Sequence, residues 1–258
     1  MPEFKYSRRV RFDSQVGDEL DYLSQLNRFP APMEAMDLVG KMEPNIFVTG
    51  GVARQAALMQ ITGIAAHALP ATTDCDLVSF SEGGIYRGRF KTPVAAIYVG
   101  YNRSFADRFD IFLDKHTALT IDQLVMGTPK GSVVPELFAT DEAVLGYVNR
   151  VIEISPYQNG TCRSTDSIIG FSAVCRAAVM GEILRPQGFV NAVNPDFAAD
   201  VLRECWSENR AVGKLRSAVN KSKLHGVQEG LFNYFGSLGF TIPKKIVEEP
   251  PYRSEDEF

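Results

Sequence analysis

The sequence lacks the features that mark a membrane or secreted protein. Among its 258 residues, no apolar run approaches the roughly 20 residues that a membrane-spanning helix needs. The first segment, MPEFKYSRRVRFD, carries basic residues without the apolar stretch that a secretory signal has behind them. We therefore expect a cytoplasmic protein with no membrane partner.

Residues that commonly hold metal through sulfur or imidazole are also scarce. The four cysteines are Cys75, Cys162, Cys175 and Cys205, and no two of them have C-x-x-C spacing. The three histidines, which are far apart along the chain, are His67, His116 and His225. These spacings argue against a structural zinc site and favour reduced, mostly buried cysteines.

A basic excess is missing as well, since the formal net charge is −4. Proteins that bind long stretches of nucleic acid usually carry such an excess, so any contact with nucleic acid must come from a local patch. One candidate patch has a single acidic residue nearby, Glu208, and consists of Arg210, Lys214, Arg216, Lys221 and Lys223. Phosphates of an RNA acceptor or plain solvation of a helix face explain this cluster equally well.

The composition is that of an ordinary globular protein, with 45% apolar and 22% charged residues. Within this chain, a pair of glycines lies between two segments predicted to be structured. The short apolar run Ile46–Val48 predicts a buried strand, and the apolar pattern over Val52–Ile61 predicts a helix. Gly50 and Gly51 lie at this junction, where backbone amides can approach a phosphate closely. Arg54, one turn into the helix, could pair with an outer phosphate or stabilise the contact between helix and sheet.

A pair of carboxylates follows on the next predicted strand. Asp74 and Asp76 are two residues apart, so a strand would place both side chains on one face. Carboxylates held this close repel each other unless a cation lies between them. Because Mg²⁺ prefers carboxylate and phosphate oxygens, the D-x-D pattern predicts a metal site.

A third carboxylate would complete that site. Further strands are predicted over Val94–Val99 and Arg108–Asp114, and Asp110 interrupts the apolar run of the second one. Asp107 and Asp114 compete for the same role, but the apolar neighbours of Asp110 indicate burial and favour it. Two Mg²⁺ ions held by three carboxylates can activate a hydroxyl and stabilise a leaving pyrophosphate.

The order of these motifs resembles the polymerase-β nucleotidyltransferase superfamily over roughly residues 46 to 114. The pattern G-G-x-x-R, formed by Gly50, Gly51 and Arg54, resembles in particular the branch of tRNA CCA-adding enzymes and bacterial poly(A) polymerases. Gln55 stands where that branch has an aspartate. The segment Thr72–Asp76 also resembles the T-x-D-x-D pattern of toxin-type nucleotidyltransferases.

The resemblance implies a role for each matching residue. Catalysis and metal binding would belong to Asp74, Asp76 and Asp110, and nucleotide binding to Gly50, Gly51 and Arg54. The implied reaction moves an NMP from an NTP to an acceptor hydroxyl, most plausibly an RNA (tRNA) 3′ end. Alternatives are a toxin-type enzyme that modifies tRNA or a protein, and a catalytically inactive binding module.

The expected fold class is α/β (α+β), with a small mixed sheet followed by a helical C-terminal part. We expect N-terminal helices in 1–45, a catalytic core in 46–130, a mostly helical domain in 131–247 and a disordered acidic tail in 248–258. Apolar periodicity predicts C-terminal helices over Ser167–Leu184, Phe197–Trp206, Val212–Leu224 and Val227–Leu238. It also predicts helices within residues 15–42 and a partly helical segment over Leu137–Val151.

Overall fold

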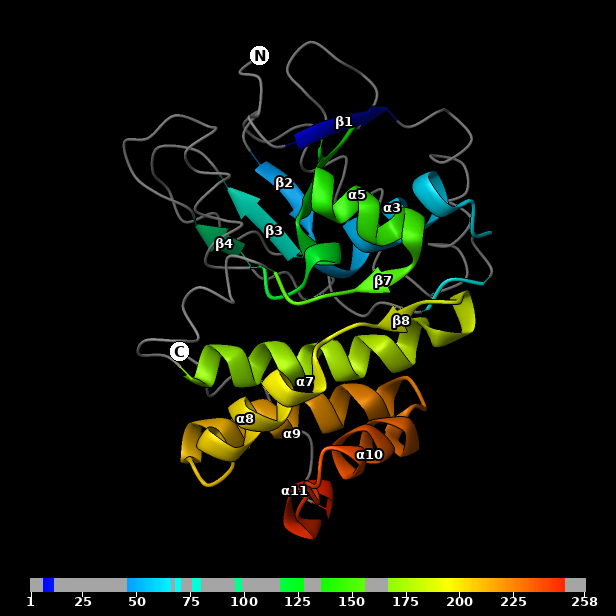
Figure 1. Ribbon diagram of the computed structural model, residues 1–258. Helices are drawn as coiled ribbons and strands as arrows, with labels where there is room; N and C mark the ends of the chain where they lie inside the picture. The colour runs from blue at the N-terminus through cyan, green and yellow to red at the C-terminus, as the bar shows by residue number, and fades with distance from the viewer. Residues whose placement is uncertain are drawn as a thin grey trace. The chain divides into compact units, whose positions relative to one another are not determined.

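The computed structural model describes residues 7–11, 46–65, 68–70, 76–79, 96–98, 117–127, 136–155 and 167–248. The chain divides into two units, coloured from blue to green and from green to red in Figure 1. The first unit comprises residues 1–117 and 121–149, and the second comprises residues 118–120 and 150–258. The first contains a sheet and the second is mainly helical, which confirms the predicted fold class.

The first unit contains a six-stranded sheet with the order β1-β6-β5-β2-β3-β4. Its strands are β1 (Ser7–Arg11), β2 (Ile46–Thr49), β3 (Asp76–Ser79), β4 (Ala96–Tyr98), β5 (Leu124–Gly127) and β6 (Glu136–Thr140). All neighbouring strands are antiparallel except β3 and β4, which run parallel. The sheet is therefore mixed, as predicted. β1 was not predicted from the sequence.

Two helices, α3 (Gly50–Thr62) and α5 (Asp141–Asn149), pack against this sheet and against each other. Every side chain of α3 from Val52 to Met59 is buried. The small residues Ala53, Ala56 and Ala57 are fully buried, so the helix can lie close to its neighbours. The apolar run after the glycine pair thus forms the predicted helix.

The second unit is built around one long helix, α7 (Ser167–Leu184), which packs against α8, α9 and α10. The other helices are α8 (Pro195–Cys205), α9 (Asn209–Leu224), α10 (Gln228–Ser237) and α11 (Lys244–Glu248). Two short strands, β7 (Val151–Ile152) and β8 (Val190–Asn191), form a parallel pair beside them. The four C-terminal helices predicted from periodicity are all present.

Aromatic side chains form a cluster in this helical unit. The ring of Trp206 lies 6.2 Å from that of Phe171, 5.8 Å from that of Phe235 and 4.8 Å from that of Phe240, measured between centroids. Cys175 and Cys205 are buried in the same unit. The only tryptophan of the chain is therefore a reporter of packing in the second unit.

The first unit extends through β5, β6 and α5 to Asn149. The reason is nonlocal pairing, since β5 and β6 belong to the same sheet and α5 packs on α3. The helices predicted within residues 15–42 and the acidic tail beyond residue 248 lie outside the described residues.

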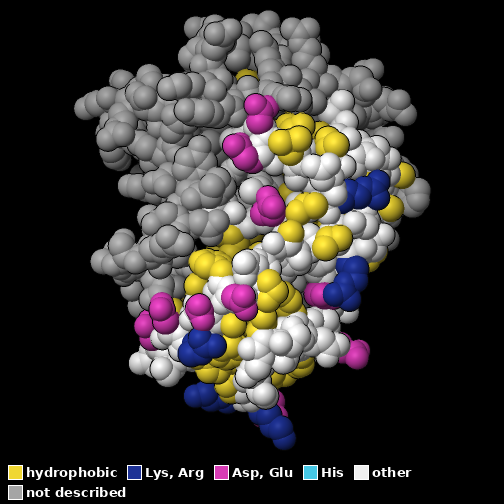
Figure 2. Space-filling view, viewed as in Figure 1, with side chains coloured by type: hydrophobic (Ala, Val, Ile, Leu, Met, Phe, Trp, Pro, Cys, Tyr) yellow, Lys and Arg dark blue, Asp and Glu magenta, His cyan; other side chains and the backbone are white. Residues whose placement is uncertain are grey.

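Surface features of the described part are mixed. On the face shown in Figure 2, acidic, basic and hydrophobic side chains are interspersed. None of the helices in the described ranges is both long enough and apolar enough to cross a membrane. The cytoplasmic location stays a prediction.

Candidate functional site

The glycine pair forms a sharp junction between β2 and α3. Gly50 has a φ of 66°, a left-handed conformation that residues with a Cβ rarely adopt. Thr49, at the N-cap position, makes no side-chain cap, and its hydroxyl instead donates to the carbonyl of Leu124 at 3.1 Å. The first turn of α3 also contains no acidic residue. Among the described residues, neither a side-chain cap nor a carboxylate of the first turn satisfies the first amides of α3, an arrangement suited to an anion.

Asp76, the second aspartate of the D-x-D motif, has its backbone beside this junction. β2 and β3 are antiparallel, and Asp76 pairs directly with Thr49, the residue that precedes Gly50. Directly opposed residues in such a pair have Cα atoms about 4.5–5.5 Å apart. Strand pairing thus brings the backbone of Asp76 next to the glycine turn, although Asp76 follows Gly50 by 26 positions in the sequence.

Of the three aspartates predicted for the site, the structure describes the backbone of Asp76 alone. Asp74 and Asp110 lie outside the described residues, as do the competing Asp107 and Asp114. Within the described ranges, no group of three or more His, Cys, Asp or Glu residues could hold a metal ion. The metal role of the three aspartates therefore stays a prediction.

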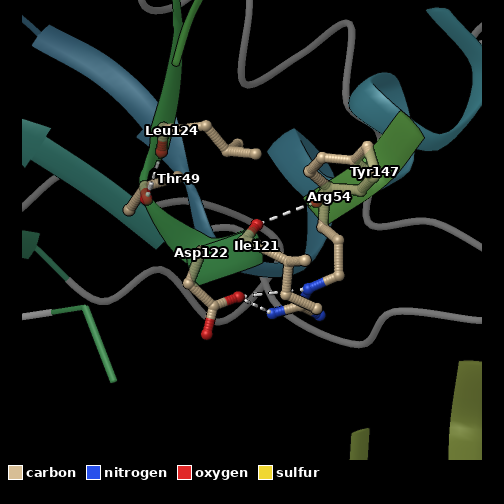
Figure 3. Close-up of polar contacts among 6 residues, drawn as sticks. All are labelled: Thr49, Arg54, Ile121, Asp122, Leu124 and Tyr147. Carbon is tan, nitrogen blue, oxygen red and sulfur yellow. Dashed lines mark hydrogen bonds and ion pairs between the residues drawn. The ribbon is translucent and has the colours of Figure 1, made fainter. Parts of the chain in front are cut away.

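Arg54 is buried and forms an ion pair that was not anticipated. Its Nη2 and Nε atoms donate to Oδ1 of Asp122 at 2.6 and 3.2 Å, and both side chains are less than a tenth exposed (Figure 3). Asp122 ends the 3₁₀ turn η2 (Thr120–Asp122), just before β5. The pair therefore joins α3 to the segment that leads into the sheet, which is the second of the two roles considered for Arg54. Its contact with a phosphate stays a prediction.

Tyr147 reinforces the same segment from α5. Its hydroxyl donates to the carbonyl of Ile121 at 2.9 Å, as Figure 3 shows. Burial raises the pKa of the Tyr147 phenol well above its usual value; the nearby Arg54 lowers this pKa and Asp122 raises it. Two helices, α3 and α5, are thus anchored to consecutive residues of one turn.

Sequence reasoning missed Asp122 because it lies between two segments rather than within a periodic pattern. One signal was available: Asp122 is the only charged residue between Thr117 and Met126, in the stretch TALTIDQLVM. An acidic residue in such surroundings indicates burial with a cationic partner.

The basic cluster predicted from the sequence lies on one helix. All five residues, Arg210, Lys214, Arg216, Lys221 and Lys223, belong to α9, which has no acidic residue along its length. Lys214, Lys221 and Lys223 are exposed, and Arg216 is partly buried. Lys223 donates a hydrogen bond to the carbonyl of Val247 within its own unit.

Comparison with known proteins gives matches only at the level of three-dimensional structure. No family model and no curated protein sequence matches the chain. A CCA-adding enzyme solved with CTP matches with a TM-score of 0.54 and 14% identity, over 91% of this chain and 56% of the other. The chain has the fold of the part of the CCA-adding enzyme that it covers.

Two further structures of CCA-adding enzymes agree with this result. An apo form matches with a TM-score of 0.56 and 14% identity, over 91% of this chain and 55% of the other. The Thermotoga maritima CCA-adding enzyme, solved with tRNA_CCA, matches with a TM-score of 0.54 and 13% identity, over 91% of this chain and 55% of the other. The present chain spans just over half the length of these CCA-adding enzymes, and the predicted resemblance is confirmed for the fold.

Proposed function

We propose that this protein is a metal-dependent nucleotidyltransferase that moves an NMP from an NTP to a hydroxyl of an RNA acceptor, with a tRNA 3′ end as the first candidate. The observation that carries the proposal is the register of β2 and β3, which pairs Asp76 with Thr49 beside the Gly50–Gly51 turn. An aspartate whose backbone lies next to an uncapped helix start can supply a cation ligand close to an anion-binding end.

The donor chemistry fits divalent magnesium. Asp76 begins β3 next to the turn, and Asp74, two residues earlier, would share its face if the strand pattern continued. We assign the cation to Asp74, Asp76 and Asp110, which offer the oxygen ligands that Mg²⁺ prefers. Two bound Mg²⁺ ions would supply charge neutralisation for a triphosphate and for the pyrophosphate that leaves.

The glycine turn would bind the outer phosphates of the NTP. Gly50 and Gly51 leave the start of α3 without side chains that would block a close approach. The helix end carries partial positive charge, which favours the phosphates. The Arg54–Asp122 pair would keep this helix end in place, so that its amides are already oriented when the nucleotide binds.

The reaction itself is an in-line displacement at the α-phosphorus. The acceptor hydroxyl oxygen forms the new bond to phosphorus, the bond to the bridging oxygen breaks, and pyrophosphate leaves while the hydroxyl proton is released. RNA is favoured as the acceptor because solved proteins with this fold include CCA-adding enzymes bound to CTP and to tRNA. The basic helix α9 adds a surface suited to phosphates.

The experiment incubates the full chain with each α-labelled NTP, Mg²⁺ and total RNA, and then asks which macromolecule carries label. We expect labelled RNA with the wild-type protein. Asp74→Ala and Asp76→Ala should each lower transfer by about a thousandfold, because several kcal/mol of transition-state stabilisation would be lost. Lys245→Ala, at an exposed position on α11, serves as the matched control. Wild-type transfer by Asp76→Ala would show that the assigned metal role is wrong.

A second candidate is a toxin-type nucleotidyltransferase, favoured by the sequence T-x-D-x-D at Thr72–Asp76. In that case the label would appear on tRNA or on a protein hydroxyl, and expression would arrest growth. Asp74→Ala should relieve the arrest. Failure of the wild-type chain to bind any NTP in the presence of Mg²⁺ would instead identify an inactive binding module.

A further inference from the structure

The second unit contains a cavity of about 230 Å³ between α7 and α9. One stripe of each helix lines it, with residues spaced three, four and seven apart so that they share a face. Its polar lining consists of Ser172 and Arg176 from α7 and Lys214, Ser217 and Lys221 from α9. The cavity is thus formed within one unit by two helices that pack directly on each other.

The charges around this cavity have one sign. Arg176, Lys214 and Lys221 contribute three cationic groups, and no carboxylate is among the residues that line it in the described part of the chain. The floor is apolar, with Val179 and Met180 among its residues. Three cationic groups around one small opening attract an anion.

Two serine hydroxyls add hydrogen-bond donors to the cavity. Ser172 and Ser217 come from opposite helices, and each can donate one hydrogen bond. Cationic groups and hydroxyl donors around one small cavity match the several acceptor oxygens of a phosphate group.

The volume of the cavity indicates which kind of phosphate compound it can hold. Sites for drug-sized ligands usually span about 300–1,000 Å³, and this cavity of about 230 Å³ is smaller. One phosphate with part of its ribose fits this volume, and the rest of the chain extends out of the open side. The cavity is therefore suited to a single link of a nucleic-acid backbone.

We propose that the cavity between α7 and α9 binds one backbone phosphate of the RNA acceptor. The inference rests on the proposed function in taking RNA as the acceptor, and it uses none of the residues assigned to NTP binding. It also separates the basic cluster of α9 by role. Lys214 and Lys221 line the phosphate site, whereas Lys223 is not part of its lining.

The test measures binding of a short fluorescein-labelled single-stranded RNA by fluorescence anisotropy, without NTP and without Mg²⁺. Lys214→Glu should weaken binding about tenfold and lower the slope of log affinity against log salt by about one. Lys245→Glu reverses the same charge at an exposed position on α11, outside the cavity lining, and should bind RNA nearly as the wild type does.

A second variant guards against effects of folding. Ser217→Asp leaves all three cationic groups in place and adds a carboxylate to the lining, so it should weaken RNA binding as well. Ser217 and Lys214 are both exposed, and the melting temperatures of their variants should match that of the wild type. Inorganic phosphate should compete with RNA for the wild-type protein and less effectively for Lys214→Glu.

Three results would overturn the proposal. The first is wild-type RNA binding by both cavity variants. The second is equal weakening by Lys214→Glu and Lys245→Glu, which would indicate a general charge effect. The third is phosphate competition that depends on Lys214 while RNA binding does not, which would mean that the cavity takes a free anion only. Lys214-dependent RNA binding without any NMP transfer would instead uphold this site and contradict the proposed function.

Discussion

Helix α3 in the first unit and helix α8 in the second begin in opposite ways. Asn194 caps α8 by accepting from the amides of Asp196 and Phe197, and Pro195 occupies the first turn. α3 begins at a left-handed glycine, has no side-chain cap and has no acidic residue in its first turn. A capped helix start has already satisfied its amides, whereas an uncapped one can offer them to a ligand.

Ion pairs show the same contrast between the units. The Arg54–Asp122 pair of the first unit and the Arg203–Asp200 pair of the second both have N–O distances of 2.6 Å. The first pair has side chains 8% and 5% exposed, whereas both side chains of the second are 70% exposed. Equal shortest N–O distances at unequal burial imply that the first pair contributes more to the stability of its unit.

The largest expected effect comes from breaking the buried pair. Asp122→Ala should lower the free energy of unfolding by about 3–5 kcal/mol, because the Arg54 cation would be left buried without its carboxylate. The matched variant Asp200→Ala should cost less than about 1 kcal/mol. Urea titration followed by far-UV circular dichroism measures both changes. Similar losses for the two variants would remove the distinction between the units.

The glycine turn gives the next effect. Gly50→Ala should cost about 1–2 kcal/mol of stability, because alanine is strained at a φ of 66°. Gly51→Ala is the matched control, since Gly51 lies within the helix, where alanine is tolerated or stabilising. Thermal unfolding of the two variants provides the comparison. A Gly50→Ala variant as stable as Gly51→Ala would show that the left-handed conformation is not required.

The smallest effect is expected at the cap of α8. Asn194→Ala should cost about 1 kcal/mol, because two amides lose their acceptor. Fluorescence of Trp206, which follows the last residue of α8, reports the unfolding of this unit. Asp196→Ala leaves the Asn194 cap intact and should cost less. The cap account would be contradicted if Asn194→Ala left the transition unchanged.

The two units also differ in how well the sequence predicts them. In the second unit, apolar periodicity predicts α7 with the bounds that the structure gives, Ser167–Leu184. Local information is sufficient there because each helix satisfies its own backbone hydrogen bonds. In the first unit, the segment expected to be partly helical over Leu137–Val151 divides into β6 and α5. Strand pairing depends on distant residues, which a local pattern does not contain.

The candidate site likewise has features that motifs predict and features that only the fold reveals. The glycine turn and the strand that begins at Asp76 follow from motifs, but the pairing of β2 with β3 that brings them together does not. The partner of Arg54 does not follow from a motif, because Asp122 lies 68 residues further along the chain. Only the fold brings the two together.

The most direct test of the central claim is calorimetric titration of NTP into the wild-type protein and into Asp76→Asn, with and without Mg²⁺. The variant keeps the size of the side chain and removes its charge. We predict that Mg²⁺ strengthens NTP binding at least about tenfold in the wild type and has no such effect in Asp76→Asn. Equal dependence on Mg²⁺ in the two proteins would contradict the assignment of Asp76 to a nucleotide-and-metal site.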